Sequence, residues 1–228
     1  MYKTELHCHT SPISNCAHVS PEETVEQYIE NGYTTLVITN HLSPTYYRAV
    51  LPESITEPYD IEEYFLSDYR RAKKQAGDRL NVLFALELRV KENMNDYLIY
   101  GVTEDFVHTL GNVMDKKIKD IVPVIHENGG LIFQAHPFRD TMTVTSPRLI
   151  DGVEVINLSK HLDRNEFAEL WAHKYGLLKV YGSDYHDKNY MKGGGILTDT
   201  PITTEKELYN VLKSQNFSFT DGENIIKP

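Results

Sequence analysis

The sequence predicts an α/β fold in which a mainly parallel sheet closes, or nearly closes, into a barrel. Short apolar runs rich in β-branched residues alternate with helical patterns along the 228 residues. This alternation is typical of parallel strands joined by crossover helices. Roughly seven such units fit a barrel better than an open sheet. No internal repeat or low-complexity linker divides the chain, so we expect one domain over residues 1–228.

The first strand and helix follow from local signals. Residues 3–9 are predicted to form a strand. The helix after it begins at Ser20-Pro21-Glu22-Glu23, where Ser20 can cap, Pro21 suits the first turn and Glu23 completes a capping box. The helix is expected to end at Asn31-Gly32, with Gly32 as its C-terminal cap.

The later elements continue the same alternation. Strands are expected at 34–39, 80–90, 97–100, 131–134, 152–156 and 177–181, and helices at 59–76, 115–128, 163–175 and 203–213. Gly193-Gly194-Gly195 lacks the strand and helix context of a phosphate-binding loop, so we expect a turn near the mouth of the site.

Composition limits the classes of function. A net charge of −10 argues against a grip on long nucleic acid, which depends on clustered Lys and Arg. No stretch of the sequence approaches the roughly 20 apolar residues that cross a bilayer. The N-terminus has no apolar secretory segment, so we expect a cytoplasmic protein with no membrane partner, whose Cys8 and Cys16 are reduced thiols.

Metal-binding residue types stand at the ends of the predicted strands. In a β/α barrel the carboxyl ends of the strands form the face on which active sites are built. The residues at or just past these ends are His7, His9, His41, Glu87, His136, Asp184 and His186.

Spacing within the strands adds detail. Because successive side chains alternate, His7 and His9 point the same way while Cys8 points away. The same alternation pairs Asp184 with His186. Glu87 is isolated in an apolar strand, where an unpaired carboxylate is costly to bury. A bound cation would explain its burial, and a carboxylate can also bridge two ions. Imidazole with carboxylate is the ligand set of zinc, manganese or iron.

Each of these residues has an ordinary alternative reading. His41 could be a hydrogen-bonded core histidine, His136 a turn residue and Asp184 a cap. Their recurrence at five strand ends favours a metal site instead. The other histidines do not share this placement and are expected to be structural or solvated: His108, His126, His161 and His173.

These motifs resemble, in order, those of the PHP (polymerase and histidinol phosphatase) family. The resemblance runs from residue 4 to about residue 196 and rests on His7-Cys8-His9-Thr10, Thr39-Asn40-His41, Glu87, Gln134-Ala135-His136-Pro137 and Gly182-Ser183-Asp184-Tyr185-His186. It implies a distorted (β/α)7 TIM-like barrel that holds two or three divalent ions and hydrolyses phosphate esters. By position, one ion would take His7, His9, Glu87 and Asp184, a second Glu87 and His136, and a third His41 and His186.

The sequence departs from the family pattern at two places. Family members usually have an Asp or His soon after the first motif, where this chain offers Cys16 or His18; if neither binds, the third site is weak or empty. The family also often places a His before the strand at 97–100. Asp96 stands there, and we favour it over His108 as the missing ligand of the second ion.

The resulting hypothesis is a phosphatase acting on a small phosphorylated substrate. Arg139 is expected to stabilise charge on the phosphoryl oxygens, and His186 or His9 to pass a proton to the leaving oxygen. Two alternatives stay open: an amidohydrolase-type enzyme acting on amides or lactones, and a non-catalytic PHP-like binding module. The sequence does not determine which ester is used, which metal is bound, or the oligomeric state.

Overall fold

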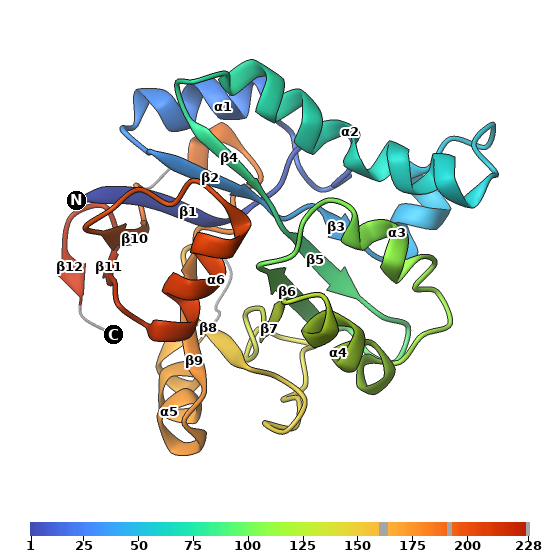
Figure 1. Ribbon diagram of the computed structural model, residues 1–228. Coiled ribbons are helices and arrows are strands. Elements are labelled where there is room, and N and C mark those ends of the chain that lie inside the picture. The colour runs from blue at the N-terminus through green and yellow to red at the C-terminus, as the bar shows by residue number, and fades with distance from the viewer. Residues whose placement is uncertain (160–163, 191–192, 227–228) are drawn as a thin grey trace.

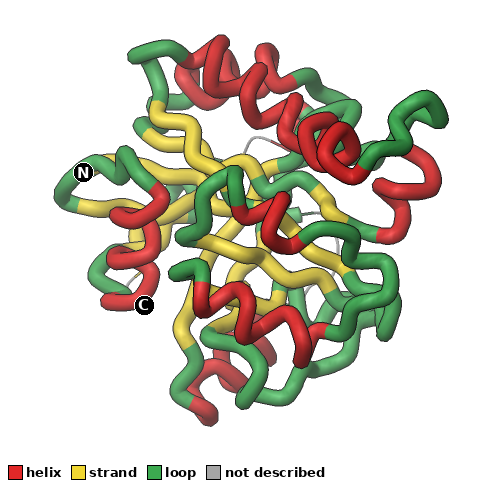
Figure 2. Tube along the Cα trace, turned by 45° about the vertical axis from the view of Figure 1, so that its right-hand side comes forward, coloured by secondary structure: helices red, strands yellow, loops and turns green. Residues whose placement is uncertain are grey.

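Strands occupy the centre of the molecule and helices surround them (Figure 1, Figure 2). The computed structural model describes residues 1–159, 164–190 and 193–226. The elements in chain order are β1 (Tyr2–Cys8), α1 (Pro21–Glu30), β2 (Thr35–Ile38), β3 (His41–Leu42), the π-helix η1 (Tyr46–Val50), α2 (Pro58–Ala76), β4 (Asn81–Phe84), β5 (Leu86–Arg89), β6 (Asp96–Tyr100), α3 (Phe106–Leu110), α4 (Ile118–Glu127), β7 (Leu131–Gln134), β8 (Gly152–Asn157), α5 (Asn165–Tyr175), β9 (Leu178–Gly182), the 3-10 helix η2 (Lys188–Tyr190), β10 (Gly195–Thr198), α6 (Glu205–Ser214), β11 (Ser218–Thr220) and β12 (Ile225–Ile226).

The strands form a closed ring. Two six-stranded sheets, in the orders β12-β11-β10-β1-β2-β4 and β3-β5-β6-β7-β8-β9, meet on both sides. On one side β4 continues into β5 through Ala85, whose N–H donates to the carbonyl of Ile38. On the other, the segment after β9 pairs with the end of β1, and His9 N–H donates to the carbonyl of Tyr185 at 2.9 Å. The predicted α/β barrel is therefore confirmed, as a distorted ring of strands.

In the second of these sheets, one strand runs against its neighbours. β6 is antiparallel to both β5 and β7, with Asp96 opposite Arg89 and Tyr97 opposite Gln134. The sequence predicts a strand here but gives no direction for it. Because β6 is reversed, its first residue lies at the ring end where the parallel strands finish. This places Asp96 at that end.

The helices cover the ring, and α1 has the caps that the sequence predicts. Ser20 Oγ accepts the N–H of Glu23, the Glu23 side chain returns to the Ser20 backbone, and Gly32 after the helix has a positive φ of 72°. α2 packs beside α1 and on β4, α4 on β7 and α5 on β8. Each buries its apolar side against the strands, as an amphipathic helix does.

The C-terminal segment closes the opposite end of the ring. The side chain of Tyr209 on α6 lies against Gly101, directly after β6, and Gln215 at the end of α6 accepts the N–H of Lys179 at the start of β9. The turn expected at Gly193–Gly195 is wrong in part, because Gly195 begins β10, which pairs antiparallel with β1. Strands β10, β11 and β12 were not predicted, since runs of two to four residues carry too little pattern to recognise.

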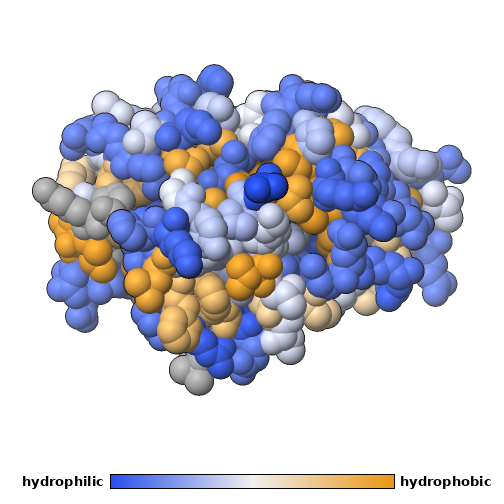
Figure 3. Space-filling model, turned by 90° about the horizontal axis from the view of Figure 1, so that it is seen from below, coloured by the Kyte–Doolittle hydropathy of each residue, from blue (hydrophilic) through white to orange (hydrophobic). Residues whose placement is uncertain are grey.

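Within the parts of the chain that the structure describes, no helix combines the length and the apolar character that crossing a bilayer requires. On the face shown in Figure 3, hydrophilic side chains predominate and the hydrophobic ones form separate patches.

Candidate metal centre

A cluster of buried ionisable side chains fills the end of the ring where the parallel strands finish. The cluster brings together all the residues that the sequence singles out at strand ends, and Asp96 and Cys16 as well. Its members are His7, His9, Cys16, His41, Glu87, Asp96, His136, Asp184 and His186.

Glu87 lies at the centre of the cluster and is fully buried. Its Oε2 atom is 3.3 Å from His7 Nε2, 3.2 Å from His9 Nε2 and 3.1 Å from His41 Nδ1. Its Oε1 atom is 3.2 Å from His136 Nε2. The two carboxylate oxygens therefore face different sets of histidines, which is the arrangement a bridging carboxylate needs.

The first group of donors consists of His7, His9, Glu87 and Asp184. Asp184 Oδ1 is 3.3 Å from the Nε2 atoms of both His7 and His9. One donor atom from each of the four residues lies within 4.8 Å of the others, and all four residues are buried. Cys8 and Tyr185 point away from this group, as the alternation along the strands predicts, and both are buried in the core.

The second group lies on the Asp96 side of Glu87. Asp96 Oδ2 is 3.9 Å from His136 Nε2, and His41, Glu87 and Asp96 also place donor atoms within 4.8 Å of one another. In the structure Arg89 holds Asp96 with two hydrogen bonds, one from Nε to Oδ1 at 2.6 Å and one from Nη2 to Oδ2. His108 is not part of the group.

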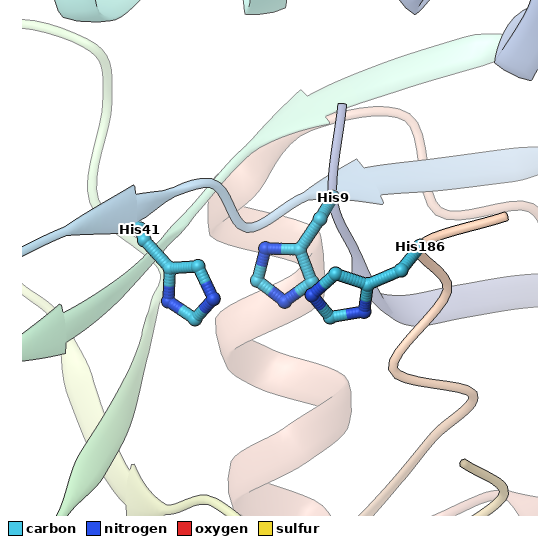
Figure 4. A group of neighbouring side chains, drawn as sticks. All are labelled: His9, His41 and His186. Atoms are coloured by element: carbon cyan, nitrogen blue, oxygen red, sulfur yellow. The ribbon is translucent and has the colours of Figure 1, made fainter. Parts of the chain in front are cut away.

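The third group contains His9, His41 and His186, which come from three separate segments and point toward one another (Figure 4). Cys16 Sγ lies 3.1 Å from His186 Nε2. The N–H of His18 donates to the His186 carbonyl at 2.8 Å, which holds the loop after β1 against this segment. Cys16 and His18 are both exposed on the cavity wall, and Cys16 is the better placed of the two sequence candidates because its Sγ atom contacts His186.

Hydrogen bonds fix the orientation of the first two histidines. His7 Nδ1 donates to Glu154 Oε1 at 2.8 Å. His9 Nδ1 is 3.2 Å from Ser14 Oγ, whose own proton goes to Asn40 Oδ1, so His9 must be the donor there as well. With the proton on Nδ1, each ring turns its Nε2 atom toward the cluster.

Two carboxylates of the cluster, Glu87 and Asp184, are held in the charged form. Burial by itself raises the pKa of Glu87, but the neighbouring His7 and His41 outweigh it and hold that pKa well below its ordinary value. Burial likewise opposes ionisation of Asp184, and His7 and His9 again lower its pKa well below the ordinary value. The pKa of Asp96 is raised, because burial and the nearby Glu87 carboxylate outweigh its contact with Arg89.

The histidines divide into two sets. Burial lowers the pKa of His7, His9 and His136, but the facing carboxylates outweigh it and raise all three above the ordinary value. Burial dominates at the other two, so the pKa of His41 falls well below the ordinary value and that of His186 falls to about 4. The set facing the carboxylates holds protons that a cation would displace.

The donor set fits divalent metal ions. Four buried side-chain atoms of the cluster have no hydrogen-bond partner among the described residues: His7 Nε2, His9 Nε2, Glu87 Oε2 and His136 Nδ1. Buried polar atoms are nearly always satisfied, so unsatisfied ones that converge on one point indicate a missing partner. Three of the four converge at the first group, and imidazole with carboxylate suits zinc, manganese or iron.

Glu154 is a buried carboxylate in contact with the cluster that the sequence does not single out. Its Oε1 atom accepts His7 Nδ1, and its Oε2 atom accepts the N–H of His136 and the side-chain amide of Asn157. Glu154 therefore orients the ring of His7 in the first group and holds the backbone of His136 in the second group. Its place inside a predicted strand, in the run GVEVI, was the available signal, because a buried carboxylate needs partners there.

Two further features let the strand ends approach one another. A Cβ atom on Gly182 would lie 2.3 Å from His7 Cβ and 2.5 Å from Glu154 Oε1, so only glycine fits there. Asp184 and His136 both have positive φ angles, 52° and 29°. Non-glycine residues adopt such angles at a cost, and they concentrate at functional sites.

A cavity of about 410 Å³ opens over the cluster, a size typical of small-molecule sites. Arg139 lies in its wall, where its Nη2 atom donates to Asp184 Oδ2 at 2.7 Å and to Ser159 Oγ at 3.0 Å. His186 also lines the cavity, whereas His9 is fully buried beneath it.

The remaining histidines lie elsewhere. His108 Nδ1 is 2.6 Å from Glu62 Oε2 on α2, and His126 Nε2 is 2.9 Å from Asp151 Oδ2. His173 is exposed on α5. His161 lies outside the described residues.

The family follows from a match along nearly the whole chain. The family model described as the PHP domain matches residues 5–224. The chain belongs to the PHP family. No curated protein matches the chain closely enough to add a function. The buried His, Asp and Glu cluster fits a multi-metal site of the PHP type.

Solved structures agree on the fold. A two-domain protein of Bacteroides vulgatus containing a predicted PHP-like metal-dependent phosphoesterase matches with a TM-score of 0.70 and 16% identity, over 98% of this chain and 66% of that one. The PHP chain thus spans slightly less than two thirds of that protein. A Bifidobacterium adolescentis protein with the provisional name metal-dependent phosphoesterase matches with a TM-score of 0.55 and 14% identity, over 93% of this chain and 96% of that one. A Chromobacterium violaceum amidohydrolase with bound sulfate matches with a TM-score of 0.56 and 16% identity, over 97% of this chain and 100% of that one.

Replacing Glu154 by Gln should weaken metal binding by about 10- to 100-fold, because the His7 ring loses the carboxylate that orients it. Competition with a chromophoric chelator measures the affinity. Glu166→Gln, an exposed change on α5, serves as the control. Equal affinities in the two variants would exclude the positioning role of Glu154.

Metal affinity should rise with pH beyond the ordinary titration range of histidine. The pKa values of His7, His9 and His136 are raised, so their protons persist above that range and a cation must displace them. As pH rises through the raised pKa values, fewer protons remain to be displaced and binding tightens. Titration calorimetry in buffers of different ionisation enthalpy, from about pH 6 to about pH 9, counts the protons released. A release that stays constant over this range would contradict the prediction.

Proposed function

We propose that this PHP protein is a metal-dependent phosphatase that hydrolyses a small phosphate ester. The observation that carries the proposal is the buried Glu87 carboxylate, shared between two groups of metal-donor side chains beneath a cavity with Arg139 in its wall. The size of that cavity supports a small substrate, and the net charge of −10 argues against long nucleic acid.

Three groups of residues would hold two or three ions of zinc, manganese or iron. The first ion would take His7, His9, Glu87 and Asp184, the second Glu87, Asp96 and His136, and the third Cys16, His41 and His186. When bound, such ions supply Lewis-acid polarisation of a phosphoryl group and a water molecule of lowered pKa.

Arg139 would bind the phosphoryl oxygens. Its guanidinium lies beside Asp184 in the cavity wall, and a planar fork of N–H donors suits phosphate. Contact with Asp184 and Ser159 holds the side chain in place before substrate arrives. A donor fixed in this way stabilises developing charge without reorganisation.

We assign His9 and His186 to metal binding rather than to the proton transfer expected from the sequence. His9 lies fully buried below the cavity, and its Nδ1 proton is committed to Ser14. His186 Nδ1 donates to the Asp184 carbonyl at 2.8 Å, and its pKa of about 4 leaves the ring neutral near pH 7. Its Nε2 atom is therefore an acceptor, which suits a metal ligand better than an acid.

Chelation should abolish hydrolysis of p-nitrophenyl phosphate by the purified protein, and adding back zinc, manganese or iron should restore it.

Arg139→Met should lower kcat/KM by about 10²- to 10³-fold, because the phosphoryl oxygens lose a fixed donor. Steady-state kinetics of metal-loaded protein measure both effects. Arg148→Met is the matched control, since Arg148 is exposed and does not line the cavity.

A parallel assay against amides and lactones separates the amidohydrolase-type alternative. Turnover of these substrates without phosphate release would reject the phosphatase proposal. Metal-loaded protein that turns over neither class would favour the non-catalytic alternative.

Cys16 should act as a thiolate ligand of the third ion. Burial, with Glu87 and Asp184 nearby, raises the pKa of the metal-free thiol to about 12, so thiolate there reports a bound cation. Cobalt-loaded protein should show thiolate-to-cobalt charge-transfer absorption in the near ultraviolet, and Cys16→Ser should lose it. Thiolate coordination would also favour zinc or iron over manganese.

Cys8→Ser is the control, because Cys8 is buried away from the cluster. Absorption that persists in Cys16→Ser, or is absent from the unaltered protein at full cobalt occupancy, would remove Cys16 from the ligand set.

A further inference from the structure

A second cavity, whose wall does not include Arg139, adjoins the metal centre. Its volume is about 240 Å³. It shares three wall residues with the first cavity, namely Cys16, His41 and Arg89. The rest of its wall comes from the loop after β1, from the segment between β3 and η1, and from η1 itself, and consists of Ile13, Asn15, Ser43, Thr45, Tyr46 and Val50.

Arg89 stands at the junction of the two cavities. Two of its nitrogens, Nε and Nη2, are bound to Asp96. The third, Nη1, has no hydrogen-bond partner among the residues that the structure describes, and the side chain is 25% exposed. The pairing with Asp96 fixes the guanidinium plane, so that one N–H edge is left for a ligand.

The chemistry of the second cavity suits an anion. Within the described part of the chain, Arg89 is the one charged side chain in its wall, and no carboxylate lines it. Ser43 and Thr45 add hydroxyl groups, and Asn15 adds a side-chain amide. The first cavity differs, because its wall contains Asp96, Asp184 and Asp187.

We infer that this second cavity receives the leaving group of the substrate, and that the leaving group carries its own anionic group, a carboxylate or a second phosphate, bound by Arg89. The inference rests on the proposed phosphatase activity. The small volume limits the leaving group to a short chain or a single ring, and Ile13 and Val50 give that part an apolar contact. Arg139 would hold the scissile phosphoryl group and Arg89 the far end of the same substrate.

The test compares matched esters that differ in one anionic group. Glycerol 3-phosphate and 3-phosphoglycerate have leaving groups of similar size, neutral in the first and a carboxylate in the second. Phenyl phosphate and 4-carboxyphenyl phosphate form a second pair. Zinc-loaded and manganese-loaded protein should hydrolyse the carboxylate member of at least one pair with a kcat/KM about 10-fold higher or more, mainly through KM.

Two variants separate recognition from a structural role of Arg89. Arg89→Met should raise KM for the preferred carboxylate ester about 10-fold or more and change KM for its neutral partner less than about threefold. Thr45→Val leaves the Arg89–Asp96 pair intact and should raise the same KM about two- to fivefold. Metal content, measured by elemental analysis, accompanies each variant. Arg48→Met on η1 is the control, since Arg48 is exposed and lines neither cavity.

Each outcome has a distinct meaning. Hydrolysis of all four esters with equal kcat/KM within each pair would overturn the second subsite and leave the phosphatase proposal standing. Arg89→Met that lowers kcat for both members of a pair alike, with Thr45→Val unchanged, would also overturn it, because Arg89 would then act only through Asp96. Failure to hydrolyse any phosphate ester would reject the proposed function itself.

Discussion

The burial of one carboxylate among histidines is the constraint around which this end of the molecule is organised. Glu87 is fully buried, and its two oxygens lie 3.1–3.3 Å from nitrogens of His7, His9, His41 and His136. A charged group in such surroundings is costly unless cations or strong donors face it. The four histidines come from three separate strand ends, so Glu87 is satisfied only when the ring of strands has formed.

Closure of the ring depends on a second layer of carboxylates. Glu5 Oε1 accepts the N–H groups of Leu6, His7 and Ser183, and so joins β1 to the segment after β9. Glu154 orients His7 while holding the His136 backbone. Gly182 lets these groups approach, since any side chain there would collide with His7. Glu5, Glu154 and Gly182 do not face the cavity, but they set the positions of the metal-donor residues that lie beneath it.

The two ends of the ring have different roles. One end is closed by α6 and contributes to the core. The other carries the metal centre and two adjoining cavities with separate guanidinium groups, Arg139 over Asp184 and Arg89 over Asp96. Each arginine is held by a carboxylate of the cluster, so their positions depend on the same strand ends as the metal donors. An enzyme built this way would select its substrate by the spacing of two anionic groups.

The sequence by itself determined the barrel class, the capped first helix and the donors at the ends of parallel strands, because alternation and strand-end placement are local and periodic. Only the tertiary structure decided the features of the site that depend on closure of the ring of strands. The reversed β6 brings its first residue, Asp96, to the site, and the loop after β1 folds back to set Cys16, rather than His18, over His186. The role of Glu154 and the second cavity at Arg89 also arise from segments distant in sequence. Strand direction and contacts between distant segments leave no periodic trace in the chain, and so only the folded structure could show them.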